Sequence, residues 1–230
     1  VIVPPATYFE KIQAVLRKYE VLLIADEVIC GYGRTGNMWG SQTYGMAPDI
    51  LTSAKALTSA YMPLSAVMVN EAIYQACVAE SAKIGTFGHG YTYSGHPVAC
   101  AVALETLRIY EERDIVGRVR DLAPMFQAGL RRFKDHPLVG EVRGVGLIGA
   151  VELVADKASR RPFDPTLAVG AKLVGFSHGH GAILRPIGDS IGFSPPLVIN
   201  EGEVEELLAR FGRALEDTTD WLVREGHWSA

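Results

Sequence analysis

Two ionisable residues with complementary chemistry, Asp26 and Lys55, each follow a short run typical of a buried strand. The run Leu22–Ala25 stops at Asp26, and the run Ile50–Ala54 stops at Lys55. A lysine amine with a lowered pKa is a nucleophile that forms Schiff bases with carbonyl groups. A carboxylate is the group that keeps a cofactor's ring nitrogen protonated. Together the two residue types predict chemistry between an amine and a carbonyl.

Two parallel strands of an α/β sheet would position this pair. Leu22–Ala25 is continuously apolar, as expected of a strand that helices cover on both faces. The segment Cys30–Gly36 between the two runs is too rich in glycine for the interior of a helix or strand. Because α/β sheets bind cofactors in the crevice at the carboxyl ends of their strands, we expect Asp26 and Lys55 to share such a crevice.

The pair matches the needs of pyridoxal phosphate (PLP), which uses a Schiff-base lysine and an acid beside its pyridine nitrogen. From the pattern alone a second interpretation stays open. Asp26 would then cap a local turn and Lys55 would be a solvated surface lysine, since strands commonly end in such residues.

Three segments resemble the class III (omega) aminotransferases, which are PLP enzymes of fold type I. In chain order they are Asp26-Glu-Val-Ile-Cys-Gly-Tyr-Gly-Arg-Thr-Gly36, Pro48-Asp-Ile-Leu-Thr-Ser-Ala-Lys-Ala-Leu57 and Gly90-Tyr-Thr-Tyr-Ser-Gly-His-Pro97. The resemblance extends in outline over the whole chain. It implies an α/β fold: residues 1–100 would belong to the C-terminal half of a large, parallel-sheet PLP-binding domain, and residues 101–230 would form a small α+β C-terminal domain.

The resemblance also implies roles for five residues of this first part. Lys55 would bind the cofactor covalently, and Asp26 would pair with its ring nitrogen. Val28 would press on one face of the pyridine ring. Thr92 would donate its hydroxyl to the cofactor phosphate of a neighbouring subunit, with Tyr91 beside it in the same loop. Such sharing requires a homodimer with active sites at the interface.

Arg185 ends a predicted strand and occupies the position of the arginine that, in the resemblance, holds the carboxylate of an amino- or keto-acid substrate. The planar fork of arginine meets a carboxylate through two hydrogen bonds. The alternative is a surface arginine that pairs with Asp189 or Glu152.

The expected reaction is a ping-pong transfer of an amino group from an amine or omega-amino acid to a keto acid. The sequence of residues 90–97 resembles that of the pyruvate-using branch of the family. Ile29 and Cys30 fit that branch and weaken an assignment to acetylornithine or γ-aminobutyrate. Two alternatives remain: a PLP-dependent decarboxylase or aminomutase, and a non-catalytic aminotransferase-like module. Retention of both Lys55 and Asp26 argues against the module.

Three other features are weaker candidates. Arg34 is either a substrate or phosphate ligand or, as we favour, a structural arginine that ties down its loop. The Gly-x-Gly-x-x-Gly string that begins at Gly31 imitates a dinucleotide fingerprint, but no helix rich in small apolar residues follows it. His89 and His96 have no partners at metal-ligand spacing, so we expect structural roles and no metal site.

Bulk properties exclude several classes of function. The 230 residues carry a net charge of −4, which does not suit nucleic-acid binding. No apolar run approaches the roughly 20 residues of a membrane span. Three widely spaced cysteines without a Cys-x-x-Cys predict buried free thiols and a cytoplasmic location.

The chain begins with Val-Ile-Val-Pro-Pro, which has no charged signal region. We expect it to be the C-terminal half of an aminotransferase, lacking the glycine-rich phosphate cup of the family and binding the cofactor poorly by itself.

Hydrophobic periodicity predicts the remaining elements. Thr7 with Glu10 should cap the first helix, and Asn200 should cap the last one. The expected helices cover residues 5–20, 70–82 (burying Ile73, Cys77 and Val78), 97–112, 115–133, 166–178 and the segment after 200; the expected strands cover 21–26, 49–54, 64–69, 139–153, 182–185 and 190–193.

Overall fold

The structure, a computed structural model, describes residues 1–229 and divides into two compact units. One unit is Pro4–Gly117, and the other joins Val1–Val3 to the chain from Arg118 onward. The boundary between the two units of this chain therefore falls after Gly117, and the helix at 97–112 belongs to the first unit. The domain boundary near residue 100 concerns the complete protein and stays a prediction.

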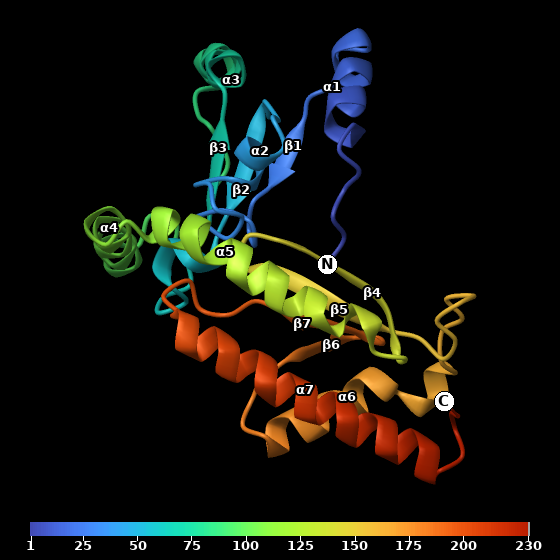
Figure 1. The fold of residues 1–230 in the computed structure, drawn as a ribbon. Helices are drawn as coiled ribbons and strands as arrows, with labels where there is room; N and C mark the ends of the chain where they lie inside the picture. Colours follow the sequence, from blue (N-terminus) through green and yellow to red (C-terminus); the bar gives the residue numbers. More distant parts are fainter. Residues whose placement is uncertain (230) are drawn as a thin grey trace. The chain divides into compact units, whose positions relative to one another are not determined.

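The first unit is built on a three-stranded sheet in the order β1-β2-β3 (Figure 1). β1 (Ile24–Asp26) and β2 (Ile50–Ser53) are parallel, as the sequence predicts, whereas β3 (Ala66–Val69) is antiparallel to β2. The helices of this unit are α1 (Tyr8–Lys18), α2 (Gly40–Thr43), the 3-10 helix η1 (Lys55–Thr58), α3 (Glu71–Ile84) and α4 (Pro97–Glu112).

Burial in the first unit is lower than the apolar runs predict. In β1, Ala25 is buried but Ile24 is 60% exposed, so the prediction of a strand covered on both faces is wrong for this chain. No residue of α3 is buried, which also contradicts the predicted burial of Ile73, Cys77 and Val78. An apolar side chain leaves water only where another element packs on it, and within residues 1–229 none covers these faces.

The first helix is anchored by a side chain other than the predicted cap. Thr7 stands at the N-cap of α1 but forms no side-chain capping bond, because its backbone (φ −94°, ψ 0°) is not extended. Gln13 instead ties α1 to the loop after α2: its amide donates to the Gly45 carbonyl at 3.2 Å and accepts from the Ala47 N–H at 2.9 Å.

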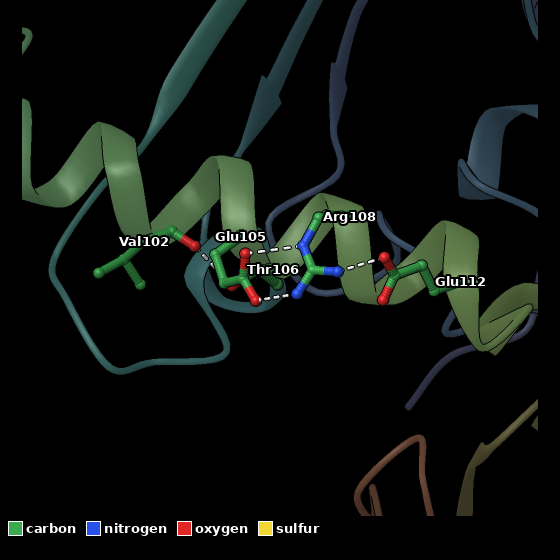
Figure 2. A network of polar contacts seen from close by, with 5 residues as sticks. All are labelled: Val102, Glu105, Thr106, Arg108 and Glu112. Carbon is green, nitrogen blue, oxygen red and sulfur yellow. Dashed lines mark hydrogen bonds and ion pairs between the residues drawn. The ribbon is translucent and has the colours of Figure 1, made fainter.

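Helix α4 belongs to the same unit and packs against η1. Ala99 and Ala103 lie on that face at a spacing of one turn. Figure 2 shows the exposed side, where Arg108 lies between Glu105 and Glu112 and pairs with both. Because exposed ion pairs contribute little to stability, we expect the buried face of α4 to stabilise it more than these pairs do.

The second unit has a four-stranded antiparallel sheet in the order β4-β5-β7-β6. This helix-rich unit with an antiparallel sheet has the predicted α+β character. β6 begins at Arg185, where the predicted strand ends. The strands are β4 (Val139–Val145), β5 (Ile148–Leu153), β6 (Arg185–Ile187) and β7 (Ser190–Phe193), and the helices are α5 (Ile115–Arg131), η2 (Arg132–Asp135), η3 (Pro165–Leu167), α6 (Val169–Gly179) and α7 (Glu201–Arg224).

The core of the second unit lies between its sheet and its helices (Figure 1). Phe211 of α7 is fully buried, and its ring meets Phe133 and Phe193 edge-on at centroid distances of 4.8 and 5.0 Å. As predicted, Asn200 caps α7, in a reciprocal pair of 2.9 Å hydrogen bonds with Glu203. Within residues 1–229 no helix is both long and apolar enough to cross a membrane.

His136 gives the second unit a dependence on pH. Burial lowers the pKa of its imidazole below the usual 6.5; the nearby Glu216 opposes this shift and Lys157 adds to it. The unfolded chain therefore binds the proton more readily than the folded one, so the free energy of unfolding should fall as pH drops below about 6.5.

Urea unfolding of this chain at pH 7.5 and pH 5.5 measures that loss. We expect His136→Asn, which keeps an acceptor for the Leu138 N–H, to lose less stability between the two pH values than the wild type. Equal losses in both proteins would contradict the assignment to His136.

Candidate functional site

The parallel pairing of β1 and β2 brings Asp26 and Lys55 to the same edge of the sheet. Asp26, the last residue of β1, stands opposite Thr52 of β2 in the register. Lys55 follows β2 after a single alanine and begins η1. Both residues thus lie at the carboxyl ends of neighbouring parallel strands, as the sequence predicts.

Asp26 is exposed, and its carboxylate has few hydrogen-bond partners in this chain. Its Oδ1 accepts the Val28 N–H at 3.0 Å, and the Thr52 hydroxyl lies 3.5 Å from the same oxygen. A carboxylate that faces solvent with acceptor capacity left over suits a protonated ring nitrogen as a partner. Val28 itself is half-buried beside it.

Lys55 lines an open pocket of about 590 Å³ together with Thr58, Met62 and residues 63–65; Asp26 is not among the lining residues. The backbone of Lys55 has φ +44°, in the left-handed region that ordinary residues seldom occupy. Such strain persists where the surrounding structure enforces it, and it is commonest at functional sites. Lys55 as a whole is exposed, which agrees with its place at the edge of an open pocket.

The glycine-rich segment Cys30–Gly40 is a largely buried platform beside these two residues. The Tyr32 hydroxyl hydrogen-bonds the Ser53 hydroxyl at 3.0 Å, two residues before Lys55. Both side chains are at most 5% exposed, and the Tyr32 ring packs on Trp39. Sequence reasoning missed Tyr32 because a hydroxyl pair between separate segments leaves no local pattern.

Glu27 is the other residue that sequence reasoning missed. It is 3% exposed, and its carboxylate accepts the N–H groups of Gly40 and Ser41 at 2.8 and 2.6 Å. Its place directly after an apolar strand and before a glycine-rich loop was the available signal. Helix α2, whose first turn supplies these N–H groups, was also not predicted.

Cys30 and Arg34 lie within the same platform. Burial, followed by the charge of Glu27, raises the pKa of the Cys30 thiol, so this cysteine is neutral near pH 7 and is not activated as a nucleophile. Burial lowers the pKa of Arg34, which lies close to Tyr110. This enclosure favours the structural alternative for Arg34.

The remaining candidate residues lie elsewhere. Tyr91 and Thr92 are exposed in the loop before α4, where the Tyr91 N–H donates to the Ser94 hydroxyl. Arg185 belongs to the second unit and is exposed at the start of β6. The acids proposed as its alternative partners are engaged otherwise: Glu152 pairs with Arg143, and Asp189 accepts the Gly170 N–H.

The platform has no room for a side chain at Gly40. A Cβ there would lie 2.7 Å from the Cys30 Cβ and 3.0 Å from a Glu27 carboxylate oxygen. We expect Gly40→Ala to destabilise the first unit by about 1–3 kcal/mol, the usual cost of overpacking, in urea unfolding followed by circular dichroism.

Gly88→Ala is the matched control, because a Cβ at Gly88 would meet nothing within 4 Å. A Gly40→Ala variant as stable as Gly88→Ala would show that the residues around Gly40 rearrange at little cost in stability.

The sequence profile of the family described as "Aminotransferase class-III" matches residues 1–215. This chain belongs to the class III aminotransferases. Its similarity to solved members is equally clear. A structure described as "Transaminase with L-ala" is 54% identical with a TM-score of 0.94, over 96% of this chain and 52% of the other. The omega transaminase from Pseudomonas jessenii, in complex with PMP, is 51% identical with a TM-score of 0.94, over 97% of this chain and 49% of the other.

A curated class III relative is gamma aminobutyrate transaminase 3, chloroplastic, from Solanum lycopersicum. It is 50% identical over 218 residues, which are 95% of this chain and 42% of that protein. The chain thus spans about half the length of the curated relatives it matches. The expectation that Ile29 and Cys30 weaken a γ-aminobutyrate assignment stays a prediction.

The residues of this class III chain fit PLP. An exposed amine on a strained backbone lines a pocket, and an exposed carboxylate with acceptor capacity ends the neighbouring strand. Lys55 would hold the cofactor covalently, Asp26 would meet its ring nitrogen, and Val28 would lie against its ring. These residues supply the amine and the acid that PLP chemistry requires.

Proposed function

We propose that the complete protein carrying this chain is a PLP-dependent aminotransferase that moves an amino group from an amine or omega-amino acid to a keto acid. The observation that carries the proposal is the placement of Asp26 and Lys55 at the carboxyl ends of two neighbouring parallel strands, with Lys55 lining a pocket. Membership of the class III family supports the same reaction.

When bound, PLP supplies an electron sink for the pair released as a bond at the substrate carbon breaks. Lys55 would bind the cofactor covalently and would be displaced by the donor amine. Its freed Nζ would take a proton from the substrate carbon and return it on the cofactor side, as general base and then general acid. Asp26 would hold a proton on the ring nitrogen with its carboxylate, which would keep the ring positively charged and favour removal of the proton by Lys55.

Pyruvate is the keto acid we propose as acceptor. The segment Gly90–Pro97 resembles the pyruvate-using branch, and one similar solved transaminase carries L-ala, the amino acid that pyruvate becomes. Arg185 would pair with the carboxylate of such a substrate, because its guanidinium is exposed at the start of β6.

A homodimer with shared sites follows from the same proposal. Tyr91 is 80% exposed, and Thr92 beside it is also exposed, so both side chains are accessible on the surface of this chain. A hydroxyl in such a loop is available to the cofactor phosphate of a second subunit. A cytoplasmic location completes the proposal, supported by three cysteines that are free thiols.

The test is a pair of half-reactions in the complete protein loaded with PLP. Addition of an amine donor should convert the bound PLP to the pyridoxamine form in the absorption spectrum. Addition of pyruvate should then restore the first spectrum and yield one alanine per site.

Each other outcome has a defined meaning. A spectrum that responds to the amine but not to any keto acid, with release of carbon dioxide or an isomerised amine, would replace the proposal with a decarboxylase or aminomutase. A protein that forms no covalent complex with PLP would leave a non-catalytic relative.

A further inference from the structure

Glu27 is a buried acid to which the proposed reaction gives no role. Among the buried residues that the structure describes, Glu27 is the only carboxylic acid; the other buried titratable side chains are Tyr32 and Tyr110. Carboxyl groups are almost never so fully buried unless they are paired. Its neighbour in the sequence is Asp26, the acid proposed to meet the ring nitrogen.

Every polar atom of Glu27 is engaged with backbone. The carboxylate accepts the Gly40 N–H on one oxygen at 2.8 Å and the Ser41 N–H on the other at 2.6 Å. The Glu27 N–H donates to the Thr52 carbonyl at 2.8 Å, and the Glu27 carbonyl accepts the Gly31 N–H at 2.8 Å. Glu27 thus ties its own peptide to β2, to the glycine-rich loop and to the start of α2.

Asp26 depends on that peptide for its position. The shorter of its two contacts, at 3.0 Å, comes from the N–H of Val28, so the Asp26 carboxylate and its donor flank Glu27 on either side. An exposed carboxylate with one such bond would otherwise sample several rotamers. The buried side chain of Glu27 holds the backbone from which both partners project.

We propose that Glu27 is a positioning residue that fixes the Asp26 carboxylate for the cofactor's ring nitrogen by locking the Asp26–Val28 turn. The inference rests on the proposed function, because Asp26 must bind that nitrogen for its position to matter. Glu27 acts through Asp26 and does not touch substrate or cofactor.

Two glycines lie close to Glu27, one to its backbone and one to its carboxylate. A Cβ on Gly31 would lie 2.7 Å from the Glu27 carbonyl oxygen, and one on Gly40 would lie 3.0 Å from its carboxylate. Glutamine has nearly the same shape but directs an NH2 group at one of the two N–H donors. Glu27→Gln therefore removes one anchor without changing volume.

The test is a double-mutant cycle in the complete protein, with the dissociation constant for PLP as the readout. The variants are Glu27→Gln, Asp26→Asn and the two combined, with the exposed Glu10→Gln as control. We expect Glu27→Gln to weaken PLP binding at least tenfold in the wild-type background and less than twofold in the Asp26→Asn background. The pH titration of the bound cofactor's absorbance should also shift in the same direction in Glu27→Gln as in Asp26→Asn.

Equal fold-losses in both backgrounds, or an unshifted titration, would overturn the positioning role and leave Glu27 as an anchor of the loop only. Glu27→Asp keeps the charge but reaches less far, and it should give an intermediate loss that also disappears with Asp26→Asn; it serves if Glu27→Gln unfolds. A wild-type protein that fails to bind PLP, or an Asp26→Asn variant that binds it unchanged, would overturn the proposed function together with this inference.

Discussion

Lys55→Ala in the complete protein will lower the rate of amino transfer by about a thousandfold or more, because Lys55, the one lysine among the described residues that line this pocket, would both bind the cofactor covalently and carry the proton. The variant should fold as well as the wild type, since alanine at φ +44° is strained as lysine is. Single-turnover absorbance with a donor amine measures the rate. Borohydride reduction followed by peptide mass analysis shows whether Lys55 carries PLP.

Lys83→Ala is the matched control for this prediction. Lys83 is exposed on α3, where it pairs with Glu80, and its loss should change neither the rate nor the labelling. PLP found on another lysine, or a Lys55→Ala variant that retains more than a tenth of the rate, would remove Lys55 from the proposed chemistry.

Phe211→Ala will have the largest effect on stability. The Phe211 ring is fully buried between Phe133 and Phe193, so truncation leaves a cavity between α7 and the sheet. The expected loss is about 3–5 kcal/mol in the free energy of unfolding, the range for phenylalanine truncated in a core. Urea unfolding of this chain, followed by far-ultraviolet circular dichroism, measures it.

Leu104→Ala provides the comparison, because Leu104 is 69% exposed on α4 and its truncation opens no cavity. A Phe211→Ala variant that loses no more stability than Leu104→Ala would show that the second unit repacks around the missing ring.

The placement of Asp26 and Lys55 at the same edge of the sheet could be predicted because it depends on one rule. Parallel strands end at the same edge of a sheet, so two ionisable residues that end such strands lie together. Glu27 and Tyr32 could not be found in the same way. Their partners, Gly40 and Ser53, lie 13 and 21 residues away, and only the folded loop brings them close.

Burial was the least predictable property. The apolar run Leu22–Ala25 predicted a strand, which forms over Ile24–Asp26 only, and the exposure of Ile24 depends on which element packs on it. The helix predicted at 70–82 forms, as α3, yet it exposes Val78 because nothing within residues 1–229 covers it. Periodicity indicates which face of an element is apolar, and only packing decides whether that face is buried.

The left-handed backbone at Lys55 has a consequence for how this sequence drifts over generations. Glycine or asparagine would adopt φ +44° with less strain, and glycine would relieve about 1–2 kcal/mol. In a lineage that no longer needed the amine, replacement of Lys55 by glycine would therefore give a more stable fold. Because lysine is the less stable choice at this position, a lysine that is retained there indicates selection for its amine.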